Sequence, residues 1–297
     1  MKPFLKWAGG KTQLLPQLEH FFPLELHNDT IKRYVEPFIG GGAVFFHIAR
    51  HYQVEEFYLA DINPELAIAY RTIQEDVESL IRKLFQIERK FKWLNEEERK
   101  VYYYKIRSQF NSTRSHWDSQ VYHQAWSERT AQTIFLNRTC FNGLFRVNSK
   151  GEFNVPMGRY KNPTICDEDN LRAIAKILKR TKIDCGDFTE CEALVDKSTF
   201  VYFDPPYRPL SKTANFTSYS KNSFEDKEQL RLRDFLTRLH QKGAKLMLSN
   251  SHVQDDFLAR EYKDYYIERV KASRSINSKG GKRGKIDELL IMNYTVN

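Results

Sequence analysis

The tetrapeptide Asp204-Pro205-Pro206-Tyr207 has the residue types needed to hold a planar amino group. It directly follows the apolar run 199–203, which we predict to be a strand, and open α/β sheets bind ligands at the carboxyl ends of their strands. Because proline fixes the backbone and lacks an N–H, the preceding carbonyls stay as rigid acceptors. Asp204 and the Pro205 carbonyl can therefore accept the two hydrogens of an NH2 group, while Tyr207 offers a ring for stacking.

Such a pair of acceptors would activate an aromatic amine, for example that of adenine. The lone pair of this nitrogen is delocalised into the ring, and acceptors directed at its hydrogens favour the tetrahedral geometry needed for attack on an electrophilic methyl group. The reaction needs no covalent enzyme intermediate. The alternative interpretation of the four residues is a turn that ends a strand and has no chemical role. A second functional motif elsewhere in the chain would favour the chemical interpretation over this one.

A second motif of this kind is the run Glu36-Pro37-Phe38-Ile39-Gly40-Gly41-Gly42, which follows the predicted strand 33–36. Asp61 ends the next predicted strand and follows Gly40 by 21 residues. An acidic residue about 20 residues after such a glycine turn reaches ribose hydroxyls, which indicates a nucleoside cofactor. Since GxGxxG is absent, the pyrophosphate site of a dinucleotide is not predicted, and S-adenosylmethionine is favoured over NAD.

The N-terminal segment FLKWAGGK at 4–11 places two cations and two glycines before a predicted helix at 12–22. It is not a P-loop, because GxxxxGK[ST] needs more residues ahead of its GK pair. Lys11 could instead meet the carboxylate of a methionine moiety, with Trp7 packed on the cofactor. The alternative is a solvated lysine beside a core tryptophan.

These motifs require an α/β sheet to position them. We predict strands at 33–36, 57–60, 182–185, 199–203, 244–248, 265–270 and 289–294, with helices at 43–50, from Pro64 onward and at 225–241. The last two strands should pair antiparallel at one edge. Between about 67 and 180 the periodicity becomes helical, clearest at 76–91, 96–110 and 120–136, with a hairpin or structured loop at 145–156. We therefore expect residues 1–66 and 181–297 to form one parallel-sheet domain, interrupted by a helical insertion at 67–180.

Composition agrees with a globular protein that binds a polyanion. The 297 residues are 41% hydrophobic and 29% charged, with a net charge of +9 and a pI near 9.2. A basic excess makes nucleic acid the first candidate partner. No run of eighteen apolar residues occurs, so a soluble cytoplasmic protein is expected. The four cysteines form no CxxC pair and no HExxH occurs, so we expect reduced cysteines and no metal site.

The chain resembles the Dam-like DNA adenine methyltransferases, the alpha-ordered group in which the glycine motif precedes the recognition domain and DPPY comes last. The resemblance runs nearly end to end. It rests on FLKWAGGK at 4–11, EPFIGGGAVFF at 36–46, Asp61, FNGLFRVNSKGEFNVPMGRY at 141–160, YFDPPYRPLSKTANFTSY at 202–219 and RSINSKGGKRGKIDELL at 274–290. It implies a Rossmann-like methyltransferase fold, S-adenosylmethionine as donor, and double-stranded DNA, with the adenine of GATC flipped out and methylated.

Carried over by position, the resemblance also assigns roles. Cofactor contacts are implied for Trp7, Lys11, Asp61 and Asp204, with Glu36, Pro37, Phe38, Gly40 and Gly42 near the methionine part and Asp187 near the cofactor adenine. Leu144, Arg146 and Pro156 would read bases, Phe141 would act as a wedge at the flipped site, and Lys6 would read the outer guanine. Phosphate contacts are implied for Arg138, Asn148, Asn154 and Arg159, and Asn142 belongs to the turn that brings this loop to the DNA.

The chain departs from the family pattern at 111–124, at Cys140 and at Phe145. Two rival functions stay open at this point: a methyltransferase acting on RNA adenine or protein glutamine, and a catalytically silent DNA-binding relative. Asp204 and the basic insertion speak against glutamine, and the intact DPPY, Asp61 and Lys11 speak against loss of activity. A restriction endonuclease that acts separately is a candidate partner.

Overall fold

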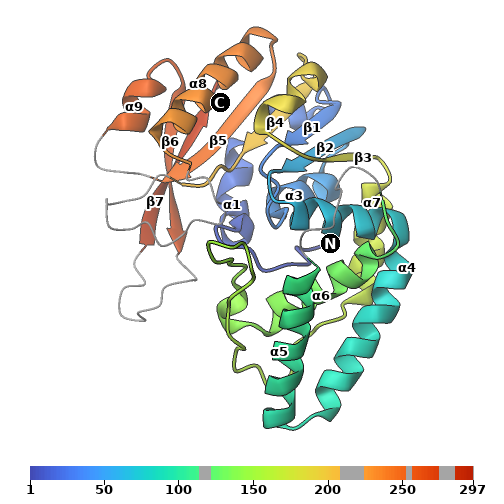
Figure 1. Ribbon diagram of the computed structural model, residues 1–297. Coiled ribbons are helices and arrows are strands. Elements are labelled where there is room, and N and C mark those ends of the chain that lie inside the picture. The colour runs from blue at the N-terminus through green and yellow to red at the C-terminus, as the bar shows by residue number, and fades with distance from the viewer. Residues whose placement is uncertain (114–121, 208–223, 252–255, 274–284, 297) are drawn as a thin grey trace. The chain divides into compact units, whose positions relative to one another are not determined.

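A computed structural model describes residues 1–113, 122–207, 224–251, 256–273 and 285–296, which fall into two compact units (Figure 1). The helical unit comprises Met1–Gly10 and Asn63–Cys185. The sheet unit comprises Lys11–Ile62, 186–207 and the described residues from 224 onward.

The helical unit is built from α4 (Pro64–Trp93), α5 (Glu96–Ser112), α6 (Trp126–Thr139) and α7 (Glu168–Leu178), followed by strand β3 (Thr181–Cys185). Local sequence explains where the first two helices begin. Asn63 accepts a hydrogen bond from the Glu65 amide and Pro64 occupies the first turn, while Asn95 and Glu98 form a reciprocal capping box. Along the described ranges, no helix is both long and apolar enough to cross a membrane.

Two predicted helix starts in this unit need correction. The helix expected at 76–91 is the second part of α4, which runs on from Pro64 and is kinked at Asp76, whose backbone is not helical. The helix expected at 120–136 begins only at Trp126; residues 122–125 are not helical, and 120–121 lie outside the described residues. Hydrophobic periodicity locates a helix better than it locates its first turn.

The strands of the sheet unit are β1 (Arg33–Glu36), β2 (Glu56–Asp61), β4 (Thr199–Phe203), β5 (Lys245–Ser251), β6 (Tyr266–Ser273) and β7 (Lys285–Met292), in the order β2-β1-β4-β5-β7-β6. The β1/β2, β1/β4 and β4/β5 pairs are parallel, whereas β7 pairs antiparallel with β5 and β6. The predicted α/β class and the antiparallel pair at one edge are confirmed. β7 begins four residues before the predicted strand at 289.

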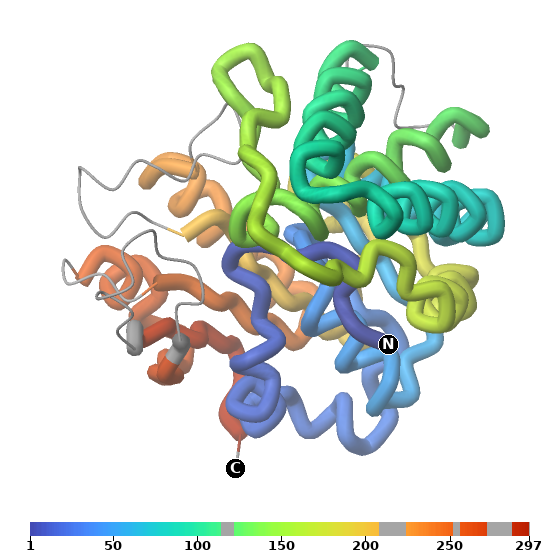
Figure 2. The backbone as a smooth tube through the Cα atoms, turned by 90° about the horizontal axis from the view of Figure 1, so that it is seen from below, coloured from blue at the N-terminus to red at the C-terminus, as the bar shows by residue number. Residues whose placement is uncertain are grey.

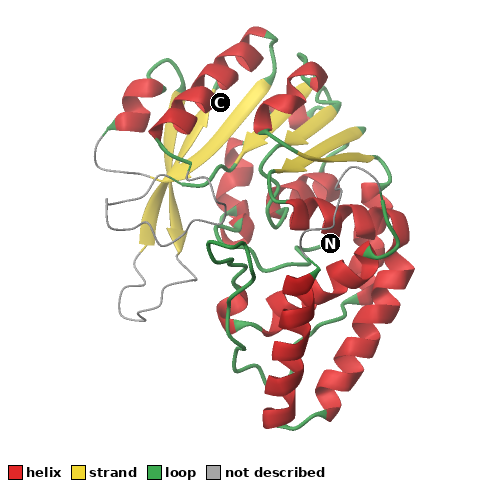
Figure 3. Cartoon of the chain, viewed as in Figure 1, coloured by secondary structure: helices red, strands yellow, loops and turns green. Residues whose placement is uncertain are grey.

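Helices cover both faces of this sheet (Figure 3). Strand residues alternate between the faces, so Val201 and Phe203 pack with Leu232 and Phe235 of α8 (Asp226–Gln241). The short helix α9 (Phe257–Glu261) contributes to the same core cluster. The other face carries α1 (Leu15–Leu18) and α3 (Ala43–His51), with aromatic contacts such as that between Phe45 and Phe57.

The helix predicted at 12–22 is broken into shorter pieces: η1 (Lys11–Gln13), α1, and η2 (Glu19–Phe21), with α2 (Leu24–His27) after them. Pro16 lies at the start of α1 and has no N–H to donate to the preceding turn. The break makes Lys11 the first residue of its own turn. Its side chain is buried in the sheet unit.

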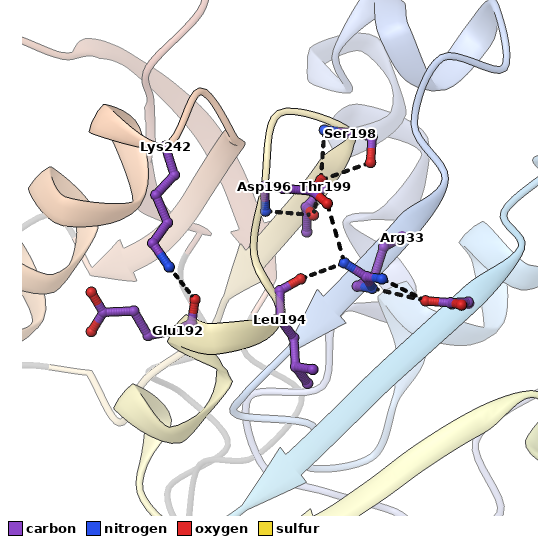
Figure 4. A network of polar contacts seen from close by, with 8 residues as sticks. Arg33, Glu192, Leu194, Asp196, Ser198, Thr199 and Lys242 are labelled. Atoms are coloured by element: carbon purple, nitrogen blue, oxygen red, sulfur yellow. Dashed lines mark hydrogen bonds and ion pairs between the residues drawn. The ribbon is translucent and has the colours of Figure 1, made fainter.

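A polar network fixes the amino-terminal ends of three strands (Figure 4). The Arg33 guanidinium donates to the Leu194 carbonyl and lies 2.7 Å from a Glu56 oxygen and 3.5 Å from an Asp196 oxygen. Asp196 also accepts from the Thr199 hydroxyl at 3.1 Å. The network links β1, β2 and the loop before β4 at their amino-terminal ends. It thereby helps to fix the positions of the carboxyl ends of these strands relative to one another.

Candidate functional site

Three acidic side chains lie at the carboxyl edge of the sheet, where β1, β2 and β4 end. Parallel pairing in register brings these strand ends to one edge. Glu36 is the last residue of β1, Asp61 is the last of β2, and Asp204 follows β4 directly. The predicted juxtaposition of the DPPY and glycine motifs is therefore present in the fold.

Asp204 is paired with a buried lysine. The Lys11 Nζ lies 2.8 Å from Asp204 Oδ1, and the lysine side chain is only 3% exposed. The same ammonium lies 4.7 Å from the centre of the Tyr207 ring. A charge this deeply buried needs a counter-charge, and Asp204 supplies it.

Burial raises the pKa of the Asp204 carboxyl to about 6, against the opposing effect of Lys11. The carboxylate is therefore the main form at neutral pH. In that form it has no proton of its own and can only accept hydrogen bonds. This is the state needed to receive the hydrogens of an amine.

The glycine turn after β1 is held by Asp61. Gly40 and Gly42 have φ values of 47° and 71°, in the left-handed region that favours glycine. The Gly40 amide donates to Asp61 Oδ2 at 3.0 Å. One carboxylate oxygen of Asp61 thus fixes the turn and joins the glycine motif after β1 to the end of β2.

Glu36 differs from the other two acids because it is buried and bonded within the protein. The Tyr34 hydroxyl donates to Glu36 Oε2 at 2.7 Å. Burial raises the pKa of the Glu36 carboxyl well above its usual range, which favours the neutral form. Glu36 therefore supports the shape of the strand end more than it adds charge.

Asp187 lies at the start of η5 (Phe188–Leu194) and is strongly engaged. It caps this turn through the Thr189 amide at 3.0 Å, and both its oxygens accept from Arg231, at 2.8 and 2.7 Å. The arginine lowers the pKa of Asp187 to about 2. Beside it, the Phe38 and Phe188 rings stack with centroids 5.4 Å apart, which forms an apolar wall next to a carboxylate.

In the helical unit, the N-terminal segment passes beside the end of α6 (Figure 2). Asn137 accepts from the Lys6 amide at 2.7 Å and donates to the Lys6 carbonyl at 2.8 Å. The Lys6 ammonium lies 4.5 Å from the centre of the Tyr160 ring. A Cβ on Gly143 would come within 2.4 Å of the Lys6 side chain, so glycine is needed for this close approach.

Two residues with roles implied by the resemblance make internal contacts in this unit. The Trp7 ring stacks on Phe145, with centroids 5.5 Å apart. Arg138 donates from Nη2 to the Phe4 carbonyl at 2.9 Å, and burial lowers the pKa of its guanidinium. The cofactor role of Trp7 and the phosphate role of Arg138 stay predictions. Both side chains also hold the N-terminal segment.

The predicted hairpin at 145–156 is confirmed by the antiparallel bridge between Val147 and Phe153. The turn before it is η4 (Phe141–Gly143), where Asn142 has a φ of 57° and Phe141 is 48% exposed. Among the residues with implied DNA contacts, Arg146, Pro156 and Arg159 are also exposed, while Leu144, Asn148 and Asn154 are half-buried.

The sequence also allows a structural role for Arg146, in which it pairs with Glu152 and braces the loop at 145–156. Among the described residues, Arg146 and Glu152 bond to other partners. Arg146 Nε donates to Asn154 Oδ1 at 2.8 Å, and Glu152 accepts from the Asn148 side chain at 2.9 Å. Two of the implied DNA-contacting residues therefore orient each other. The hairpin presents them as a pair.

One face of α5 supports this hairpin, a feature that the sequence reasoning missed. Tyr103 donates to the Val155 carbonyl at 2.9 Å, and Arg107 donates to the same oxygen at 3.3 Å. Asn111 accepts from the Phe153 amide at 2.8 Å and donates to the Phe153 carbonyl at 3.1 Å, as a neighbouring strand would. The four-residue spacing of these three polar residues was the available signal. Residues 114–121 of the segment that departs from the family pattern lie outside the described residues.

An open α/β sheet with a glycine turn after its first strand, an acid after its second and DPPY after β4 is a Rossmann-like methyltransferase fold. A family model for D12 class N6 adenine-specific DNA methyltransferases matches residues 7–276. The chain is 52% identical over 295 residues to the type II methyltransferase M.MjaIII of Methanocaldococcus jannaschii, covering 99% of each chain. It is 42% identical to M1.LlaDCHI of Lactococcus lactis, covering 99% of this chain and 96% of that one.

A third relative is the DNA adenine methylase of Escherichia coli, with 34% identity over 292 residues, 98% of this chain and 95% of that protein. The chain therefore belongs to the D12 class N6 adenine-specific DNA methyltransferases. It methylates adenine in DNA.

Proposed function

We propose that this enzyme takes its methyl group from S-adenosylmethionine and transfers it directly to the N6 amine of a flipped adenine within GATC in double-stranded DNA. The observation that carries the proposal is the cluster at the end of β4. There, an ionised Asp204 is paired with buried Lys11 beside the Tyr207 ring. The proposed place of action is the cytoplasm.

The chain's own residues fit such a cofactor. Its ribose hydroxyls would meet Asp61, whose carboxylate is fixed by the Gly40 amide, and its adenine would lie near Asp187 and the Phe38 ring. Asp187 would share its oxygens with Arg231. Lys11 would meet the methionine carboxylate while keeping Asp204 as a partner. When bound, the cofactor supplies a methyl group activated by a positive sulfonium.

Asp204 and the Pro205 carbonyl would accept the two N6 hydrogens and so increase the nucleophilicity of the nitrogen. Pro206 keeps this backbone rigid, and Tyr207 offers a face to the extruded base. Lys11 lies over one face of the Tyr207 ring, so the base would stack on the other. The amine proton is lost as the new N–C bond forms, and Asp204, which would already accept a hydrogen bond from this amine, would receive it.

Recognition of GATC would fall to the hairpin and the N-terminal segment. We propose Leu144, Arg146, Pro156 and Lys6 as the base readers, with Arg159, Asn148, Asn154 and Arg138 at phosphates. Arginine suits this work because its planar fork can bond two acceptors on one base edge, worth about 1–3 kcal/mol of discrimination. The hydrogen bond that Arg146 Nε donates to Asn154 Oδ1 would orient this fork. The proposed domain division, 1–66 and 181–297 for catalysis and 67–180 for recognition, follows these roles except for Lys6, which lies in the range 1–66.

The test uses the purified protein with tritiated S-adenosylmethionine and four substrates: a duplex with one GATC, duplexes with each single substitution of it, the matching RNA, and a glutamine-containing peptide. We expect label only in N6-methyladenine of the GATC duplex. Label in RNA or peptide would overturn the substrate class. Equal label in all the substituted duplexes would overturn the target alone.

A separate restriction endonuclease is a proposed partner in the biological sense, since two of the relatives are named as type II methyltransferases. We predict that methylation by this enzyme protects DNA from such an endonuclease. A plasmid from cells that express the enzyme should resist an endonuclease blocked by adenine-methylated GATC, and cleavage of that plasmid would contradict it.

A further inference from the structure

We propose that Glu288 is a positioning residue of methyl transfer, which fixes the Tyr207 ring for the target base through a hydrogen bond to the tyrosine hydroxyl. The inference rests on the proposed function, in which the extruded adenine stacks on Tyr207.

The register of the sheet brings this residue to the site from far along the chain. Glu288 pairs with Ser251 at the carboxyl end of β5, and β5 is the parallel neighbour of β4. Because β7 runs antiparallel to β5, the first part of β7 lies at the edge where β4 ends. A residue 84 positions after Asp204 therefore meets the DPPY segment.

Two contacts define the role of Glu288. The Tyr207 hydroxyl donates to Glu288 Oε2 at 2.7 Å, and the Lys11 ammonium lies 3.9 Å from the same oxygen. The glutamate side chain is only 12% exposed. Burial, together with the nearby Asp204 and Glu288 carboxylates, raises the pKa of Tyr207 well above its usual range, so its hydroxyl keeps the proton that it donates.

Two contacts restrict the orientation of the Tyr207 ring. Pro205 and Pro206 fix the backbone before Tyr207, but the side-chain torsions of a tyrosine at a strand end are otherwise free. Glu288 holds the hydroxyl end of the ring, and Lys11 occupies one face. The ring is thus positioned before a base arrives, which reduces the ordering required when the base stacks.

A purely electrostatic role is the competing explanation, because Glu288 is also near Lys11. Two substitutions separate the roles. Tyr207→Phe keeps the ring but removes the hydroxyl, and Glu288→Gln keeps an acceptor oxygen but removes the charge. Glu288→Ala removes both the acceptor and the charge. Glu268→Ala, an exposed glutamate on the neighbouring strand β6, is the matched control.

The experiment measures the single-turnover rate constant on a GATC duplex and the fluorescence of 2-aminopurine at the target position, which reports base extrusion. Glu288→Ala and Tyr207→Phe should each lower the rate constant on the order of tenfold, as expected for loss of a hydrogen bond to a charged group. The double variant that combines Glu288→Ala with Tyr207→Phe should have a rate constant no lower than that of the slower single variant. Glu288→Gln should retain most of the rate, and Glu268→Ala should match wild type.

Multiplicative losses in the double variant, or a wild-type rate for Tyr207→Phe, would overturn the inference. A rate for Glu288→Gln as low as that of Glu288→Ala would do the same and assign Glu288 to charge pairing. Tyr207→Ala distinguishes failure of the positioning role of Glu288 from failure of the proposed function itself. If Tyr207→Ala is impaired while Glu288→Ala and Tyr207→Phe are not, only the role of Glu288 fails. If Tyr207→Ala methylates normally, stacking on Tyr207 fails as well.

Discussion

In the proposed mechanism, Asp204 has to remain ionised although burial opposes its negative charge. The Lys11 ammonium, which is buried and lies 2.8 Å from Asp204 Oδ1, favours the ionised form of Asp204. Glu288, Glu36 and the phenols of Tyr202 and Tyr207 surround the pair, and Glu288 works against ionisation of Asp204. The outcome is a carboxylate whose pKa of about 6 lies just below neutrality.

The pH dependence of the reaction rate should show the titration of the Asp204 carboxyl. Asp204 has a folded-state pKa above its ordinary value, so protonation occurs at a higher pH than for an exposed aspartate. A protonated Asp204 offers less acceptor capacity to the amine. We expect kcat/KM to fall tenfold per pH unit below about pH 6, measured with the duplex substrate at constant ionic strength. Constant activity from pH 7 down to pH 5 would contradict this assignment.

Asp61 provides a second prediction at the scale of one residue. Asp61→Ala should weaken S-adenosylmethionine binding by about 1.5–3 kcal/mol, because the ribose hydroxyls lose a charged acceptor. Calorimetry without DNA gives the dissociation constant. Asp61→Asn is the control, since its amide oxygen can still accept the bond from the Gly40 amide and preserve the turn. An unchanged dissociation constant in the alanine variant would place the ribose elsewhere.

Most of the helices and strands that could be predicted from the sequence are marked by local turn and capping residues. Strands β1, β2 and β4 and the helix starts after Asn63 and Asn95 carry local signals, and these predictions agree with the structure. The helix expected at 12–22 fails because Pro16 interrupts it. Contacts set by tertiary structure could not be found this way: the bond from Tyr207 to Glu288 depends on the register of β7.

The support of the hairpin by α5 leads to a prediction for the recognition loop. Asn111→Ala should leave N6 methylation possible but relax the preference for GATC, because the Phe153 backbone loses both bonds to the Asn111 side chain. The measurement is the ratio of methylation rates on singly substituted and matched sites. Ser112→Ala, whose exposed hydroxyl donates to the Gln109 carbonyl of the preceding turn, is the matched control. Ratios equal to those of wild type would contradict the role of α5.

At the scale of the whole molecule, the two units divide the proposed roles. Apart from Trp7, every proposed cofactor and catalytic residue belongs to the sheet unit, and every proposed base reader and phosphate contact belongs to the helical unit. Composition indicated a polyanionic partner through the net charge of +9. It could not locate the surface involved. The motif order separated the two roles along the chain.

Salt dependence tests whether this charge acts on the DNA backbone. Arg159→Ala should weaken binding to all duplexes alike, because a phosphate contact positions DNA without reading it. The slope of log affinity against log salt should fall by about one. Fluorescence anisotropy with GATC and unrelated duplexes measures both quantities. If affinity is lost only for GATC, Arg159 reads a base.

The central claim is that the Asp204 carboxylate, held by Lys11 at the end of β4, activates the adenine amine. The most direct test is the single-turnover rate of N6 methylation by Asp204→Ala on a GATC duplex at saturating S-adenosylmethionine, with thermal unfolding as the check of the fold. We expect a loss on the order of a hundredfold or more, with cooperative unfolding and GATC binding retained. A folded Asp204→Ala enzyme that methylates at close to the wild-type rate would contradict it.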